Sequence, residues 1–164
     1  MYETGCRKGE AFALSWDDID SKNKTVKISK NLTRKTTEGP WKIVSSKNKT
    51  SNRTVSLSNR LCEILKKHKE QCSSYQFVFG GAAPLAEKTV TRYFDAAIDK
   101  AGVKRIRIHD LRHSCASFLI SKGVSIVGVS KRLGHKDVKQ TLNTYSHLMP
   151  NEAQKIVDIF EDLD

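Results

Sequence analysis

The stretch from residue 109 to residue 145 limits most strongly what this chain can fold into, because it divides into short helices. Gly123 and Gly134 each follow an apolar helical segment, and glycine commonly ends a helix at such a place. Ser125 and Asp137 stand where the next two helices begin, and both residues are favourable N-caps. The sequence therefore predicts three consecutive short helices joined by tight connections.

Four polar side chains stand at fixed intervals in this stretch. His109 and Arg112 are three positions apart, so they are neighbours on one helix surface, at the flank of an apolar stripe. His135 directly follows Gly134, and Tyr145 lies ten residues further along the chain. Each residue taken alone reads as a surface or half-buried side chain. Together they predict polar groups that face a cleft from helices anchored by packing.

Composition points to one domain with a polyanionic partner. The 164 residues carry a net charge of +11, with +15 in residues 1–150 and −4 in residues 151–164. A strongly basic body favours nucleic acid as the partner, although basic composition also serves solubility. The chain has 38% apolar residues and no run of membrane-spanning length, so no membrane partner is expected. The four cysteines form no CxxC pair and indicate reduced thiols in a cytoplasmic protein.

The middle of the chain predicts a small basic sheet. Residues 25–30, 41–46 and 53–58 alternate in polarity and read as three antiparallel strands. Gly39-Pro40 marks the expected first turn, and a polar loop over 47–52 joins the second strand to the third. A basic hairpin of this kind is suited to a phosphate backbone, whereas a merely solvated loop is the alternative.

The remaining segments predict helices over 7–16, 58–72 and 84–101, and a last helix that starts at Pro150-Asn151. Arg7 opens the first of these helices, and Glu10 lies one turn later, where its carboxylate can hold the guanidinium in one orientation. An ordinary surface pair is the other interpretation of these two residues.

The motifs together resemble the tyrosine recombinases, the phage and transposon integrase family. The first motif reads Thr-Gly-Cys-Arg-Lys-Gly-Glu over 4–10, and the second reads His-Asp-Leu-Arg-His over 109–113, followed by Leu-Gly-His over 133–135 and by Tyr145. The resemblance implies an α+β, mostly helical DNA breaking-rejoining enzyme fold with a small three-stranded antiparallel sheet. It also implies site-specific DNA recombination through a 3′-phosphotyrosyl intermediate, with neither metal nor other cofactor.

The resemblance carries a catalytic set onto this sequence: Arg7 and Arg112 as the two arginines, His109 as the histidine of the HxxR motif, His135 at the His/Trp position, and Tyr145 as the nucleophile. Lys47 is the expected lysine of the hairpin, aligned by counting back from the strand at 53–58, and Lys49 is the alternative. In these roles the arginines bind the phosphate and Lys47 protonates the leaving 5′ oxygen. His109 assists proton transfer at the tyrosine, and His135 donates a hydrogen bond to the phosphoryl group.

Members of this family usually carry DNA-binding domains and further helices ahead of the first motif. We therefore expect residues 1–164 to be the catalytic domain of a longer integrase. The resemblance also implies double-stranded DNA attachment sites as partners and a homotetramer on DNA. In that tetramer the C-terminal helix, residues 151–164, would contact a neighbouring protomer.

Three other functions compete with this interpretation. A non-catalytic helix-turn-helix module, with helices at 109–122 and 125–133, explains the charge but gives Arg7, His135 and Tyr145 no role. A zinc hydrolase would use the i,i+4 pair of His109 and His113, but the glutamate of an HExxH motif is missing. A type IB topoisomerase shares the chemistry, and the Leu-Gly-His motif with its spacing to Tyr145 favours the integrase branch.

Overall fold

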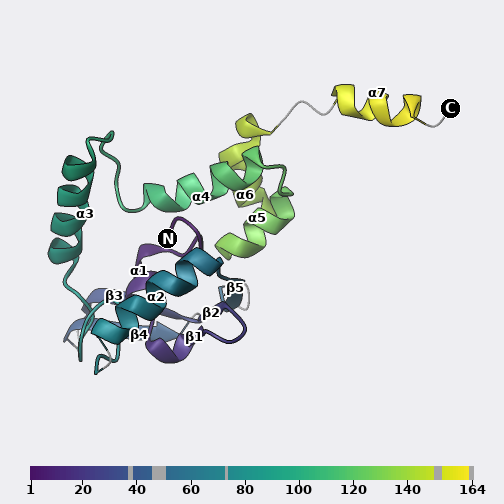
Figure 1. The fold of residues 1–164 in the computed structure, drawn as a ribbon. Coiled ribbons are helices and arrows are strands. Elements are labelled where there is room, and N and C mark those ends of the chain that lie inside the picture. Colours follow the sequence, from purple (N-terminus) through teal and green to yellow (C-terminus); the bar gives the residue numbers. More distant parts are fainter. Residues whose placement is uncertain (37–38, 46–50, 73, 150–152, 163–164) are drawn as a thin grey trace.

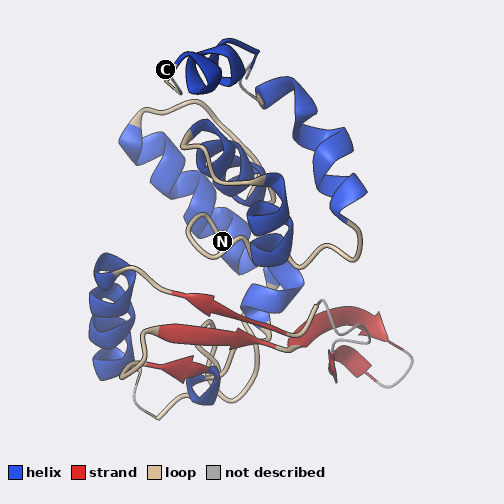
Figure 2. Cartoon of the chain, turned by 90° about the vertical axis from the view of Figure 1, so that its right-hand side faces the viewer, coloured by secondary structure: helices blue, strands red, loops and turns tan. Residues whose placement is uncertain are grey.

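The computed structural model describes residues 1–36, 39–45, 51–72, 74–149 and 153–162. The helices are α1 (Lys8–Phe12), η1 (Trp16–Asp18), α2 (Asn59–Gln71), α3 (Glu87–Ala101), α4 (Asp110–Ser121), α5 (Ile126–Leu133), α6 (Val138–Tyr145), η2 (Ser146–Leu148) and α7 (Ala153–Glu161). The strands are β1 (Ile19–Asp20), β2 (Thr25–Ile28), β3 (Lys30–Thr36), β4 (Gly39–Ser45) and β5 (Arg53–Ser56). Figure 1 shows their arrangement, and Figure 2 shows the strands gathered in one half of the molecule and most helices in the other.

A three-stranded antiparallel sheet of order β1-β2-β5 forms the core of the first half. Val26 pairs with Val55 in register, and both side chains are buried together with Ile28 on the face that packs against Cys6 and Ala11. The polar residues between them face solvent, as the period-2 alternation predicts. The predicted small antiparallel sheet is therefore present.

The membership of the sheets differs from the expectation. Residues 30–36 form β3, which was not predicted and which pairs with β4 as a separate two-stranded sheet. Gly39 and Pro40 lie inside β4 rather than in the turn ahead of it. The alternation rule missed β3 because Leu32 is its single apolar residue, and that side chain is buried against Phe12.

The second half is built on α4, α5 and α6, with the predicted stops and starts confirmed. Gly134 ends α5 in the left-handed conformation at φ 69°, the Ser125 hydroxyl accepts a hydrogen bond from Gly128 N, and the Asp137 carboxylate accepts one from Lys139 N. The helices meet in a cluster of buried residues: Ala116, Ile120, Val129, Leu133 and Tyr145. Residues 1–6 lie between the two halves, since Cys6 packs in the sheet core whereas Gly5 lies against Leu133.

Two helix predictions need correction. The first helix ends at Phe12 rather than Trp16, because Trp16 already belongs to the separate 3₁₀ helix η1. On α4 the Arg112 side chain is buried rather than reachable at the flank of the apolar stripe, whereas the apolar side chain of Phe118 is 47% exposed. A guanidinium takes the inward position on this helix, so an apolar stripe alone does not define its buried face.

The last helix, α7, extends away from the rest of the molecule (Figure 1). Its side chains Val157, Ile159 and Phe160 are 47, 64 and 67% exposed. The apolar face of α7 is therefore not buried in the core of this chain, and an exposed apolar surface of this kind is typical of an interaction site. Across the described ranges, the helices are all too short or too polar to cross a bilayer.

Candidate active site

The Arg7 guanidinium is fixed from two parts of the chain. Its Nη1 donates to Glu10 Oε1 at 2.8 Å, and its Nη2 donates to the carbonyl oxygen of Gly134 at 3.1 Å. The other carboxylate oxygen of Glu10 accepts from the Arg7 backbone N at 2.7 Å, which caps α1. The predicted contact between Glu10 and Arg7 is therefore present, and the carboxylate is buried rather than part of a surface pair.

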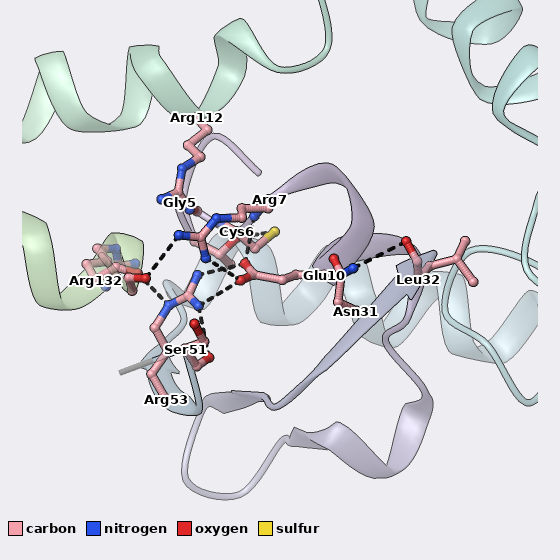
Figure 3. A network of polar contacts seen from close by, with 12 residues as sticks. Gly5, Cys6, Arg7, Glu10, Asn31, Leu32, Ser51, Arg53, Arg112 and Arg132 are labelled. Atoms are coloured by element: carbon pink, nitrogen blue, oxygen red, sulfur yellow. Dashed lines mark hydrogen bonds and ion pairs between the residues drawn. The ribbon is translucent and has the colours of Figure 1, made fainter. Parts of the chain in front are cut away.

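A third arginine, Arg53, joins this network from the start of β5. Its Nη1 and Nη2 donate to the two oxygens of Glu10 at 3.2 and 2.9 Å, and its Nε donates to the carbonyl oxygen of Arg132 at 2.8 Å. Burial favours the neutral carboxyl, but hydrogen bonds and positive charge from Arg53 and Arg7 outweigh burial and lower the pKa of Glu10. One buried carboxylate thus aligns two guanidinium groups (Figure 3).

The geometry also explains the glycine of the Leu-Gly-His motif. A Cβ atom at Gly134 would lie 2.6 Å from Nη1 and 2.9 Å from Cζ of Arg53, and the backbone there has a φ of +69°. Both the close approach and the left-handed conformation favour glycine. The motif therefore lets the guanidinium of Arg53 and the carbonyl group of residue 134 reach the same network.

Arg112 points from α4 toward this network and is 4% exposed. Its Nη1 donates to the carbonyl oxygen of Gly5, whereas its Nη2 is buried without a hydrogen-bond partner among the described residues. Burial, followed by repulsion from Arg7, lowers the pKa of Arg112 to about 10, so the group stays charged at neutral pH. A buried cationic donor without a partner is costly unless an anion completes it.

His135 stands at the edge of the same positive region. Its Nδ1 is 2.7 Å from the hydroxyl oxygen of Thr141, a residue with no exposed surface. Burial, and then the charges of Arg112, Arg7 and Arg53, lower the pKa of His135 to about 4. The ring is therefore neutral at pH 7, and with the Thr141 hydroxyl donating to Nδ1 it presents an N–H at Nε2.

Tyr145 lies at the end of α6 and is 4% exposed. Its hydroxyl oxygen is 2.7 Å from Nδ1 of His113. Burial raises the pKa of Tyr145, and the positive charge of Arg112 acts in the opposite direction. The charge of Arg112 therefore reaches both the tyrosine hydroxyl and the ring of His135.

His109 does not take the position next to the tyrosine. Its exposed ring meets the ring of His113 edge-on, with 5.1 Å between the ring centroids. Burial of part of the ring, and then the charges of His113 and Arg112, lower the pKa of His109. It lines a cleft of about 530 Å³ that also includes Lys8 and Arg107.

Lys47 and Lys49 lie outside the described residues. Ser51, which follows them, accepts a hydrogen bond from Arg53 Nη1 at 3.3 Å through its carbonyl oxygen. The described end of the hairpin loop therefore meets the arginine network.

Comparison with known proteins decides the family, because the phage integrase family matches residues 1–152 of this chain. The chain belongs to the phage integrase family. It is 31% identical over 173 residues to the ICEBs1 integrase of Bacillus subtilis strain 168, an alignment that covers 98% of this chain and 46% of that protein. It is 26% identical over 185 residues to a XerC-like tyrosine recombinase of Caldanaerobacter subterraneus, covering 99% of this chain and 47% of that protein.

Solved structures confirm the fold expected of an integrase catalytic domain. The integrase of transposon Tn1549, solved in complex with transposon right end DNA, superposes with a TM-score of 0.79 at 19% identity, covering 98% of this chain and 56% of that one. The present chain spans less than half the length of the two curated relatives above.

The family resemblance brought Arg7, Arg112 and His135 into one set, and the structure brings their side chains to one region. The sequence did not predict the contact of Arg53 with Glu10 or the contact of His113 with Tyr145. Arg53 served only as an alignment point, although its place at the end of the basic hairpin was a signal. His113 was considered only as a zinc ligand, although it directly follows Arg112.

Proposed function

We propose that this chain is the catalytic domain of a site-specific DNA recombinase that cuts and rejoins DNA through a 3′-phosphotyrosyl intermediate. The single observation that carries the proposal is the buried Nη2 of Arg112, which has no partner among the described residues and lies in a region shared with Arg7 and His135. A phosphodiester is the anion that such a set of donors fits, since arginine forks match the geometry of phosphate oxygens.

The proposed reaction displaces one oxygen of a DNA phosphodiester. The hydroxyl of Tyr145 attacks the phosphorus, the bond to the 5′ oxygen breaks, and the protein keeps the 3′ phosphate as a tyrosine ester. Charge that develops on the non-bridging oxygens is met by Arg7, Arg112 and the N–H of His135. Lys47, or Lys49, supplies the proton to the departing oxygen. Attack by a 5′ hydroxyl of another strand reverses these steps, so the bond energy is conserved and no nucleotide cofactor is needed.

We propose duplex attachment sites of a mobile element as the substrate and the cytoplasm as the place of action. The relatives named above are an integrase and a tyrosine recombinase, and the net charge of +15 on residues 1–150 supports a DNA partner. The four cysteines are free thiols, which supports a reducing compartment.

We also propose that four protomers assemble on DNA, each docking its α7 on a neighbour. The exposed Val157, Ile159 and Phe160 support this, because such a helix face buries its apolar area only against another surface. The acidic polar face of α7 opposes contact with DNA and suits a basic protein surface.

Strand exchange tests the proposed function. The full-length protein is incubated with two plasmids that carry DNA from the two sides of its gene, one of them labelled, and the products are separated after proteolysis. A recombinase yields joined molecules that hold both plasmids. Relaxed plasmids without joining would indicate a topoisomerase, and a gel shift with unchanged DNA would indicate a binding module.

A further inference from the structure

The nucleophile of the proposed reaction is held by a residue outside the predicted catalytic set. The Tyr145 hydroxyl oxygen lies 2.7 Å from His113 Nδ1, and the two ring centroids are 6.0 Å apart. Within the described part of the chain this is the hydrogen bond that the hydroxyl makes. The phenol ring is packed among the buried residues of α4 and α5, while the imidazole of His113 is exposed. The histidine therefore connects a buried hydroxyl to solvent.

His113 also stands beside the residue that meets the phosphate. Arg112 and His113 are consecutive on α4 and about 100° apart around the helix axis, so their side chains leave the same turn in two different directions. Arg112 reaches the carbonyl oxygen of Gly5, and His113 reaches the end of α6. Because both side chains leave the same rigid element, α4 sets the distance between the phosphate site and the tyrosine.

A buried phenol needs a proton acceptor when it attacks. At pH 7 a free phenol is about three pKa units from ionisation, and burial moves Tyr145 further in the unfavourable direction. His109, the residue expected to assist, has its ring against His113 rather than against the hydroxyl. Neutral imidazole accepts a proton through an unprotonated nitrogen, and Nδ1 of His113 is the ring nitrogen in contact with the phenol.

We propose that His113 positions the Tyr145 hydroxyl and accepts its proton during DNA cleavage, an inference that rests on the proposed function. In the forward step the phenolic proton moves to Nδ1 while the bond from the tyrosine oxygen to phosphorus forms and the bond to the 5′ oxygen breaks. The 5′ oxygen leaves with a proton from the hairpin lysine. In the rejoining step Nδ1 returns its proton to the tyrosine oxygen, so the ring is restored after each cycle.

The test compares three histidine variants in the full-length protein. His113→Ala removes the contact with the hydroxyl. His113→Asn keeps an amide group near the position of Nδ1 but cannot take a proton. His147→Ala, an exposed histidine of η2, is the matched control. The measured quantities are the single-turnover rate of covalent adduct formation on nicked duplexes cut from the DNA beside its gene, the dissociation constant for the same duplexes, and the unfolding midpoint.

Loss of a general base typically slows a reaction by 10²–10⁴-fold, so His113→Ala is expected to lower the adduct rate by at least about 100-fold. The DNA dissociation constant and the unfolding midpoint stay near those of the unmodified protein. His113→Asn stays at least about 10-fold slow, because a hydrogen bond alone does not remove the proton. His147→Ala retains the full rate.

A second measurement separates proton transfer from a structural role. Replacing Tyr145 with 3,5-difluorotyrosine makes the phenol more acidic, so the reaction depends less on an acceptor. The loss caused by His113→Ala is then expected to shrink by about 10-fold, whereas a structural loss would be equal with both phenols.

The inference is overturned if His113→Ala cleaves within about threefold of the unmodified protein, if His113→Asn restores the full rate, or if the fluorinated phenol leaves the loss unchanged. Failure of the proposed function looks different. In that case the unmodified protein forms no adduct on any of the duplexes, and the inference falls with it.

Discussion

Arg53 donates two hydrogen bonds to Glu10, a residue 43 positions earlier in the chain, with lengths of 3.2 and 2.9 Å. Both side chains are almost fully buried, at 8 and 4% exposure. The pair joins the strand that follows the basic hairpin to the helix that follows Arg7. Glu10 also accepts a hydrogen bond from Arg7, so the position of Arg7 depends on this contact between β5 and α1.

We expect Arg53→Ala to lower the free energy of unfolding by about 3 kcal/mol, because it leaves a buried carboxylate with one partner fewer. Denaturant unfolding measures this change. Arg60→Ala is the matched control, since Arg60 pairs with Glu3 on the surface and such pairs contribute at most about 1 kcal/mol. Equal losses in the two variants would contradict the importance given to the buried pair.

Arg112 should matter for chemistry more than for stability. We expect Arg112→Met to slow DNA cleavage by at least about 100-fold, because a donor to the developing phosphate charge is lost. The unfolding midpoint should not fall, since an incompletely paired buried cation is replaced by an apolar side chain of similar length. Cleavage rates and thermal unfolding of the same preparation check both parts. Cleavage within a few-fold of the unmodified protein would count against the phosphate-binding role.

The lowered pKa of His135 predicts a pH-dependent stability. The unfolded chain binds a proton to this ring near pH 6.5, whereas the folded chain does so only near pH 4, so stability falls as the pH drops through this interval. His135→Asn keeps a partner for Thr141 but does not titrate. The unmodified protein should therefore lose more stability than the variant between pH 6.5 and 4, measured by urea unfolding. Parallel pH profiles would show that the ring is protonated equally in both states.

The site residues that stand in recognisable sequence motifs could be predicted from the sequence. Glycines and caps fixed the helix ends around Arg112 and His135, whereas the grouping of Arg7, Arg112 and His135 in one site came from the resemblance to the tyrosine recombinases. β3 was not predictable in this way, because a strand with one apolar residue shows no alternation. The contact between Tyr145 and His113 depends on how α5 and η2 place the end of α6 against α4, which no local pattern encodes. Likewise, the burial of Arg112 depends on partners more than a hundred positions away.

The exposed face of α7 predicts a defect in assembly rather than in folding. We expect Phe160→Glu to prevent the formation of multimers on DNA while leaving the unfolding midpoint unchanged, because this side chain is 67% exposed. Light scattering of protein–DNA complexes measures the number of protomers. Glu70→Ala, an exposed acidic residue of α2, is the control and should assemble normally. Normal assembly of Phe160→Glu, or of a chain without residues 151–164, would contradict the docking proposal.

The most direct test of the account is whether DNA becomes covalently attached to Tyr145. The full-length protein is incubated with nicked duplexes from beside its gene, denatured and digested, and the DNA-linked peptide is identified by mass spectrometry. We predict a phosphate ester on Tyr145, and in Tyr145→Phe we predict no adduct together with nearly unchanged DNA affinity. An adduct that persists in Tyr145→Phe, or one that maps to another residue, would contradict the assignment of the nucleophile.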